Sequence, residues 1–319
     1  MRCLLSSISA VLFAAFTLNP NLQAELITFG SGANTFGIDF LNIGNAGNAA
    51  DTTGFGAVPY AYHVGKYEIS QDAITKATLS DVTAGPWTGN QPAATISWYE
   101  AAAFVNWLNT STGNQAAYKD LTFSGGSWSM ELWSSADAWQ LGGENLYRNK
   151  DAVYFLPSEN EWYKAAYYNP GGSNYFLYPT ASDTAPTAVA SGTNAGTAVY
   201  KFGGAAPAIV DSAGGLSPYG TMGQGGNVWE WNESAFDGIN NSSSAARAFR
   251  GGSEGSGEFD LSSSGRLSGN PANEFGLVGF RVASAEAAPV PKPGTWAAMA
   301  IFAGGAAYAG WRRRRQITL

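Results

Sequence analysis

Hydrophobic and polar residues first form a clear pattern at residues 62–69, where they alternate along YHVGKYEI. Alternation with a period of two predicts a strand that is buried on one face. Ser70 follows and is a good helix N-cap, because its side-chain oxygen can accept a free backbone N–H. Ile69 and Ile74 occupy the two positions of a hydrophobic staple around this cap. The pattern therefore predicts a strand followed directly by a helix.

Two later segments carry a stronger helix start. ISWYEAAAFVNWLN places Ser97 three residues before Glu100, and YFLPSENEWYKAAYY places Ser158 three residues before Glu161. Serine and glutamate at this spacing form a capping box, in which each side chain bonds the backbone N–H of the other residue. In the first of these helices the apolar residues share one face. These residues are Ala101, Phe104, Val105 and Leu108.

The remaining chain has weaker periodicity and no internal repeat. Residues 25–58 are rich in Gly, Asn and Ala and predict an extended, turn-rich lead-in. Residues 169–220 carry little regular signal, whereas residues 246–284 predict short strands joined by glycine turns. We therefore expect a single domain over residues 25–288.

Composition narrows the fold class. Apolar residues make up 45% of the chain, and 11 Trp, 15 Tyr and 17 Phe can fill a sizeable core, since each ring buries a large area. The 40 glycines argue against a helical bundle, because glycine weakens helix interiors and favours turns. Together these features predict an α+β fold with much irregular structure.

The N-terminal residues 1–24 have the pattern of an export signal. Arg2 precedes an apolar run that ends at Leu18, and the small residue Ala24 follows a few positions later. This order is typical of a secretory signal peptide, with cleavage after Ala24. The apolar run is short for a retained membrane helix, and Pro20 breaks helical structure directly after it. We therefore expect an exported protein.

The C-terminal residues 289–319 combine prolines, an apolar stretch and a basic cluster. Pro291 and Pro293 precede an apolar segment at 296–311, and Arg312 begins a run of four arginines. Sixteen helical residues span about 24 Å, slightly less than a bilayer core, and the arginines would stay in the cytoplasm. This order resembles the PEP-CTERM sorting signal, which implies transient anchoring in the inner membrane. It also implies an exosortase-type enzyme that removes the tail at the cell surface or matrix. A permanent single-span anchor is the alternative.

Without its ends the chain is strongly acidic. All 24 acidic residues but only 11 of the 17 basic ones lie within residues 25–290, because Arg2, Lys292 and the C-terminal arginines fall outside, which gives a formal charge of −13. Such a domain repels nucleic acid and anionic lipid and attracts cations. The only cysteine, Cys3, lies in the signal peptide. The mature protein therefore has neither a disulfide nor a thiolate ligand.

Six motifs occur in a fixed order over roughly residues 60–283, namely VGKYEIS, ISWYEAAAFVNWLN, YFLPSENEW, SPYGTMGQGGNVWEWNE, RAFRGGS and GFRVA. In this order they resemble the formylglycine-generating enzyme (sulfatase-modifying factor) family. GNVWEW followed by RGGS is the most specific part of the resemblance. The family implies a large α+β domain akin to C-type lectin-like folds, which agrees with the composition.

The resemblance also implies where copper-binding cysteines would follow the RGGS motif. Those positions hold Ser256 and Leu261. A hydroxyl is too weak an acid to replace a thiolate on a soft metal, and leucine has no lone pair. Family relatives that use iron need several histidines, and His63 is the only one in this chain. We therefore expect neither copper nor iron.

GGNVWEWNES places one acid, Glu230, between two tryptophans. The resemblance implies a structural calcium site here, formed by the backbone carbonyls of Gly226 and Val228 and the carboxylate of Glu230. Calcium binds six to eight oxygens, which a glycine-rich loop supplies readily. Gly223 occupies the place of a further family ligand. The alternative is that the tryptophans anchor the core and Glu230 accepts only backbone hydrogen bonds.

Other acidic residues give no catalytic constellation. Glu159 and Glu161 point to different faces of their helix, and the helix start already explains them.

Two functions then remain. The first is an exported surface or matrix-associated protein that binds a carbohydrate or protein ligand without catalysis. The second is an exported enzyme of the family with unknown chemistry. Arg250, Arg266 and Arg281 lie near the family's cleft and support the enzyme, but salt bridges between loops would explain them equally well. We favour the non-catalytic binding scaffold.

Overall fold

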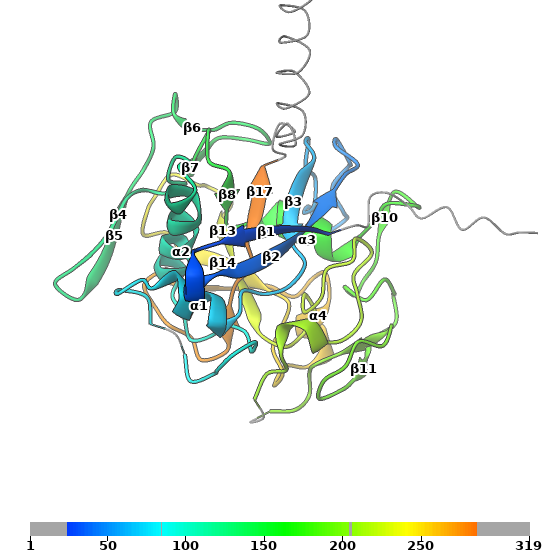
Figure 1. Cartoon of the computed structure of the whole chain (residues 1–319). Coiled ribbons are helices and arrows are strands. Elements are labelled where there is room, and N and C mark those ends of the chain that lie inside the picture. The colour runs from blue at the N-terminus through cyan, green and yellow to red at the C-terminus, as the bar shows by residue number, and fades with distance from the viewer. Residues whose placement is uncertain (1–23, 84, 204–205, 286–319) are drawn as a thin grey trace, which may run out of the picture.

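The computed structural model describes residues 24–285 except 84, 204 and 205. Two main sheets form the domain, and helices and long loops surround them (Figure 1). The first sheet has five antiparallel strands in the order β1, β2, β3, β17, β8. The two ends of the domain therefore meet in one sheet, where β17 lies beside β3. These strands span Glu25–Phe29, Phe36–Ile43, Tyr62–Gly65, Ala283–Ala285 and Tyr154–Phe155.

The second sheet has four strands in the order β15, β14, β13, β16. They span Leu267–Gly269, Arg247–Arg250, Trp229–Ala235 and Val278–Gly279. Strand β13 runs antiparallel to β14 and parallel to β16. All seven residues of β13 are buried, so the tryptophan-rich motif forms a central strand of the domain.

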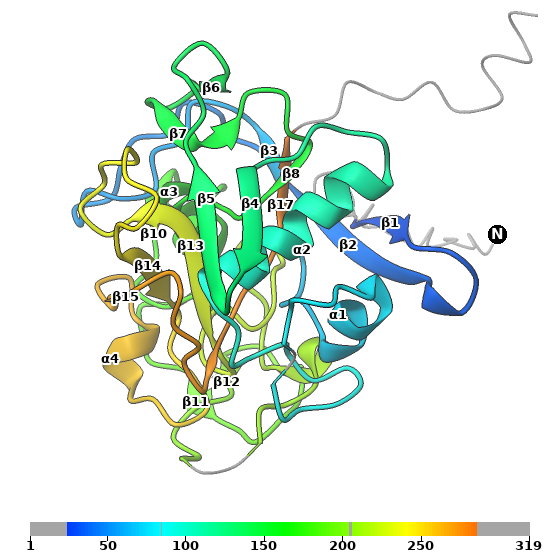
Figure 2. The same ribbon diagram turned by 90° about the vertical axis from the view of Figure 1, so that its left-hand side faces the viewer.

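Short strand pairs occupy the loops. β4 and β5 form a hairpin that projects from the domain (Figures 1 and 2). The pairs after residue 167 have only two residues per strand, so residues 169–220 are mostly irregular, as the sequence predicts. The paired strands are β4 Lys119–Ser124 with β5 Ser127–Glu131, β6 Ala138–Trp139 with β7 Asn145–Asn149, β9 Tyr168–Asn169 with β10 Asn174–Tyr175, and β11 Thr187–Ala188 with β12 Thr197–Ala198.

All three predicted helices form, and their caps are confirmed. The side chain of Ser70 accepts from the backbone N–H of Ala73. Both capping boxes, one begun by Ser97 and one by Ser158, have their two reciprocal hydrogen bonds. A fourth, one-turn helix follows the RGGS motif and was not predicted. The helices span Gln71–Ala77 (α1), Trp98–Ser111 (α2), Glu159–Tyr167 (α3) and Glu258–Leu261 (α4).

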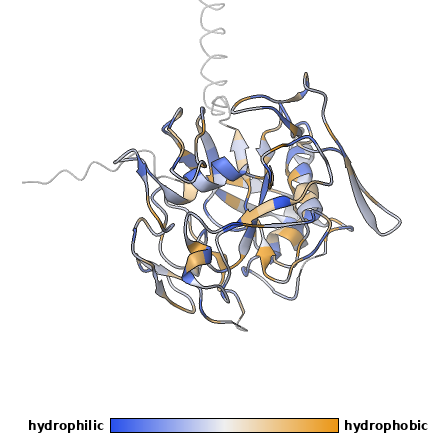
Figure 3. Ribbon diagram, turned by 180° about the vertical axis from the view of Figure 1, so that it is seen from behind, coloured by the Kyte–Doolittle hydropathy of each residue, from blue (hydrophilic) through white to orange (hydrophobic). Residues whose placement is uncertain are grey.

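The main core lies between α2 and the two sheets. All four apolar residues of the predicted α2 face are buried, and Phe104 makes an edge contact with Phe280, with ring centroids 5.7 Å apart. Trp98 makes a similar edge contact with Tyr118 at 5.2 Å. Hydrophobic and hydrophilic residues are interspersed along the loops on the side of the domain seen in Figure 3.

Two predicted elements differ from the structure. The lead-in at 25–58 contains the β1–β2 hairpin, because Phe36, Ile38 and Phe40 alternate with less buried residues along β2. Glycine and asparagine around them obscure this alternation in the sequence. The strand predicted at 62–69 ends at Gly65, where the backbone N–H of that glycine bonds the Val282 carbonyl.

The fold is an α+β fold of the C-type lectin-like type, with a few short helices and much irregular chain. Ala24 directly precedes β1. Most of the predicted signal peptide and the whole of the predicted sorting tail, with its apolar segment at 296–311, lie outside the described residues. Within the described ranges, no helix has the length and apolar character needed to cross a membrane.

Candidate functional site

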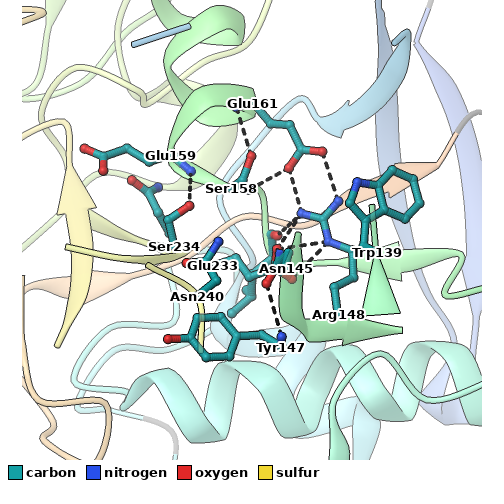
Figure 4. A network of polar contacts seen from close by, with 12 residues as sticks. Trp139, Asn145, Tyr147, Arg148, Ser158, Glu159, Glu161, Glu233, Ser234 and Asn240 are labelled. Atoms are coloured by element: carbon teal, nitrogen blue, oxygen red, sulfur yellow. Dashed lines mark hydrogen bonds and ion pairs between the residues drawn. The ribbon is translucent and has the colours of Figure 1, made fainter. Parts of the chain in front are cut away.

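A buried arginine, Arg148, joins two carboxylates from distant parts of the chain. Arg148 lies on β7, Glu161 in the first turn of α3 and Glu233 on β13. Its Nη2 atom is 2.8 Å from Oε2 of Glu161 and 2.6 Å from Oε2 of Glu233. All three side chains are excluded from solvent, and Figure 4 shows them within one polar network. The cluster therefore ties β7, α3 and β13 together.

This cluster has one cation for two acids, and the pKa values of the two acids shift in opposite directions. Burial alone would raise the pKa of Glu161, but Arg148 and hydrogen bonds from Tyr60 and Ser158 outweigh burial and hold that pKa below its usual range. Burial raises the pKa of Glu233, and Arg148 only partly offsets this effect. Both carboxylates are enclosed and hydrogen-bonded, so they stabilise the fold and offer no oxygen to a ligand.

A cavity of about 180 Å³, here called the Trp139 cavity, lies beside this cluster. Four parts of the chain form its walls: residues 55–60, residues 139–148, the start of α3 and residues 234–240. The walls combine aromatic and polar side chains, as is usual for a small-ligand site. The aromatic lining includes Tyr60 and Trp139, and the polar lining includes Asn145, Asn160, Ser234 and Asn240.

Glu159, the first residue of α3, lines the same cavity and binds two arginines. Nε of Arg250 lies 2.7 Å from Oε1 of Glu159, and Nη2 of Arg266 lies 2.7 Å from Oε2. Both guanidinium groups lie over the ring of Phe55, at 4.7 and 4.9 Å from its centroid. Salt bridges to Glu159 therefore connect Arg250 on β14 and Arg266 just before β15 to the start of α3. Salt bridges were the structural explanation of these arginines that the sequence offered.

The carboxylate of Glu230 is held by Arg281 and Trp162. Nε and Nη2 of Arg281 each lie 2.6 Å from one carboxylate oxygen of Glu230, and Nε1 of Trp162 donates to it at 2.7 Å. Glu230 and Arg281 are completely buried. A bidentate guanidinium thus already balances the charge of Glu230. The flanking Trp229 and Trp231 are buried in the core, as the alternative interpretation of this motif predicts. Its second part is wrong, because Glu230 accepts hydrogen bonds from side chains and not only from the backbone.

Buried oxygen atoms without a hydrogen-bond partner lie beside this pair. Oε2 of Glu68 accepts from Nδ2 of Asn227 at 2.7 Å, but Oε1 of Glu68 and Oδ1 of Asn227 are unpaired. Burial and the neighbouring Glu230 raise the pKa of Glu68 well above its usual range. Unpaired buried carboxyl and amide oxygens are suitable donors for a hard cation such as calcium.

A second cavity of about 200 Å³, here called the Glu68 cavity, lies beside these atoms. Glu68 lines this cavity, and its hydrogen bond from Asn227 connects it to the turn that contains Gly226 and Val228. A Cβ atom on Gly223 would lie only 2.9 Å from the Glu68 carboxylate, so a larger residue there would require this carboxylate to shift. The residues present therefore fit calcium if Glu68 and Asn227 supply side-chain oxygens. The oxygen-bearing side chains of the lining belong to Asp39, Tyr67, Glu68, Ser70, Asn90 and Asp211.

Neither residue at the family's copper-ligand positions is arranged to bind metal. Oγ of Ser256 accepts from the backbone N–H of Ser253 at 3.0 Å. Leu261 is fully buried and packs with Tyr178 and Tyr200. At the position of the family's second cysteine, this chain therefore has a leucine that packs in the core.

His63 lies on β3, opposite Ser284 of β17. Among the residues that the structure describes, no three His, Cys, Asp or Glu side chains come close enough together to hold a metal ion between them. A cation in this domain would therefore depend on amide and carbonyl oxygens as well as carboxylates.

These features define a C-type lectin-like domain whose sheets and helices are joined by buried ion pairs. A model of the sulfatase-modifying factor enzyme 1-like domain matches residues 37–286, so the chain belongs to this family. Its fold is similar to that of Treponema denticola variable protein 1, with 21% identity and a TM-score of 0.56 over 82% of this chain and 99% of that one. It is also similar to CarF, with 19% identity and a TM-score of 0.53 over 78% of this chain and 98% of that one. No curated protein sequence matches the chain.

Several site residues could not be recognised from the sequence. Arg148 and Tyr60 lie outside the six motifs, and Glu233 is the last residue of the tryptophan motif, where no spacing marks it as a partner of Arg148. Glu68 stands within VGKYEIS, where its neighbours indicate only a strand. One feature of the sequence could have indicated these residues, namely a charged residue within an apolar segment. Such a residue needs a partner of opposite charge when the segment is buried.

Proposed function

We propose that this protein is an exported, surface- or matrix-associated binding scaffold that uses its family domain without copper chemistry. The packing of Leu261 carries the proposal. An enzyme of the cysteine-dependent type needs a thiolate at this position, and the side chain here is apolar and fully buried. Ser256 is hydrogen-bonded within its own loop. These positions therefore stabilise the fold.

The Trp139 cavity supports a binding role. It combines rings with amide and hydroxyl groups, which suits a carbohydrate or a polar side chain of a protein ligand. The acids behind it, Glu161 and Glu233, are occupied by Arg148, so the arrangement favours recognition over proton transfer. We expect a ligand to be bound and released unchanged.

Calcium is part of the same proposal, in a structural role. Glu68 and Asn227 would provide side-chain oxygens, and Gly226 and Val228 would provide carbonyls. Glu230, which the sequence predicts as a calcium ligand, would provide a carboxylate oxygen only if it separated from Arg281. Calcium bound there would favour the ionised form of Glu68 and balance its charge.

Export and sorting complete the proposal and rest on sequence alone. Residues 1–24 would direct secretion. The tail from Pro291 would be processed by an exosortase-type enzyme after transient membrane anchoring. The ligand would then be a component of the cell surface or extracellular matrix, and no nucleic acid is expected as a partner.

A sedimentation assay tests the binding function. Purified full-length protein is mixed with surface and matrix material from its own host that lacks this protein, and the amount pelleted is measured. Saturable binding of the native protein is expected. Heat-denatured protein serves as the control and should show no saturable binding. A native protein that stays in the supernatant at every amount of material contradicts the proposed function.

A further inference from the structure

We propose that the Trp139 cavity binds one neutral sugar unit, with its ring against Trp139 and Tyr60. This inference rests on the proposed binding function and assigns its ligand class. Four observations carry it: the pairing of every buried charge in the wall, the arrangement of the aromatic rings, the fixed amide groups and the size of the cavity.

The buried charges at the cavity are already paired. Arg148 is bonded to two carboxylates, and Glu159 is bonded to two arginines. A charged ligand would have to compete with these partners, and breaking a buried pair is strongly unfavourable. The other carboxylate in the lining, Glu144, is exposed and would repel an anion. The cavity therefore favours a ligand that is polar but uncharged.

Two aromatic rings form a corner of the cavity. The ring centroids of Tyr60 and Trp139 are 5.3 Å apart, and their planes meet at 72°. An aromatic face provides an apolar surface beside polar groups. A sugar ring has the matching character, because its C–H groups form an apolar patch while its hydroxyls project around the edge. A wholly polar ligand would gain no apolar contact with these rings.

The amide groups of the wall are held in place by the backbone. Oδ1 of Asn160 accepts from the N–H of Gly56 at 2.9 Å, and Oδ1 of Asn240 accepts from the N–H of Ala235 at 2.9 Å. Each amide also carries an NH₂ donor, and hydroxyls can both accept and donate. Fixed side chains lose little entropy when a ligand binds. The wall is therefore prepared for hydroxyl groups.

The size of the cavity limits the ligand to one ring. At about 180 Å³ it is smaller than the roughly 300–1,000 Å³ of common small-molecule pockets. Leu141 lines it and is 56% exposed, so its side chain stands at the rim. We infer that a single terminal sugar enters, and that further units of a chain remain outside.

Calorimetric titration tests the inference with defined probes. The probes are methyl glycosides of the neutral monosaccharides released by hydrolysis of the host's own surface polysaccharide. Full-length protein is kept in a polyoxyethylene detergent, which carries no sugar. At least one probe should bind with a dissociation constant of about 1 mM, as expected for about a dozen non-hydrogen atoms. The corresponding disaccharide should bind no more than a few times more tightly, and the corresponding uronic acid should bind at least tenfold more weakly.

A matched pair of variants locates the site. Leu141→Trp should fill the rim of the cavity and weaken sugar binding at least tenfold. Leu267→Trp alters another exposed leucine, 48% exposed and outside the cavity lining, and should leave binding unchanged. The melting temperatures of both variants are measured, because unchanged melting shows that the loss at Leu141 comes from the site.

The results separate this inference from the function on which it rests. The protein could still sediment with host material although no sugar probe inhibits the binding and Leu141→Trp does not weaken it. This result would overturn the sugar site and leave the proposed binding function intact. Such a result would favour a protein ligand at another surface. Loss of sedimentation for the unmodified protein would instead reject the proposed function itself. Equal sugar binding by Leu141→Trp and Leu267→Trp would also refute the assignment to this cavity.

Discussion

The guanidinium of Arg281 forms two contacts of 2.6 Å with the carboxylate of Glu230, and both side chains are fully buried. This pair gives the acid of the tryptophan motif a structural partner. Its neighbour Glu68 keeps an unpaired oxygen and a raised pKa. The two buried acids should therefore respond differently to mutation.

Calcium should stabilise the protein, and Glu68 should be responsible for most of the effect. An ion that binds only the folded state adds about 2.7 kcal/mol at 100 times its dissociation constant. Glu68→Gln should remove most of the difference in melting temperature between calcium and chelator. The same substitution should lower the stability only slightly in chelator, because the raised pKa of Glu68 favours its neutral form there.

Glu230→Gln should destabilise the protein equally in calcium and in chelator. Identical melting of the wild type with calcium and with chelator would reject the cation.

Replacing Arg148 should be among the most destabilising single changes. Arg148→Met leaves two buried carboxylates without a cation, and removal of one partner of a buried pair costs about 3–5 kcal/mol. Glu233→Gln should cost less than half as much, because Glu161 still pairs with the arginine. Urea unfolding measures both. The control is Lys119→Met, at an exposed ion pair, which should leave the midpoint nearly unchanged. Similar midpoints for Arg148→Met and the control would show that the cluster is not important for stability.

Lys164 should make stability depend on pH. Its ammonium is buried and donates to the Asn45 carbonyl at 3.0 Å, and burial lowers its pKa to about 8. An unfolded lysine titrates near 10.4. Between about pH 8 and 10 the unfolded chain binds more protons, so this residue makes stability rise with pH, and its penalty is complete below pH 8.

Lys164→Met should therefore be most stabilising, relative to wild type, at pH 7, and its advantage should shrink as pH rises from 8 to 9.5. Urea unfolding at several pH values gives the difference, and Lys76→Met is the matched surface control. A constant difference across this range would show that the lysine is not desolvated.

Copper should confer no oxidase activity. Full-length protein loaded with copper is incubated with a sulfatase-type cysteine peptide, and mass spectrometry follows the product. No aldehyde above the no-protein control is expected, because Ser256 and Leu261 replace the thiols. Copper-dependent aldehyde formation would restore the enzyme hypothesis.

The C-terminal tail should be removed in a host that has an exosortase system. Mass spectrometry of surface protein should then find no peptide from Trp296 onward. Neutral replacements of Arg312 to Arg315 should impair correct membrane topology, since these charges hold the cytoplasmic end. Full-length chain retained in the membrane fraction would instead support a permanent anchor.

Local features of the fold could be predicted from the sequence. Ser97 with Glu100 and Ser158 with Glu161 define helix starts, because their hydrogen bonds depend only on the fixed spacing of one helical turn. The ordered motifs were sufficient for the family. The absence of cysteine after Cys3 likewise follows from residue identity alone.

Only the tertiary structure decided which charges meet. Arg148 is 85 residues from Glu233, and Arg281 is 51 residues from Glu230. No local spacing relates such residues, since their contact depends on how β7, α3 and the strands beside β13 pack. The same packing leaves Oε1 of Glu68 unpaired and creates the Trp139 cavity from four distant segments. The sequence thus determined where elements begin and which thiol chemistry is absent. Long-range packing determined which polar atoms are satisfied and which are available to a ligand.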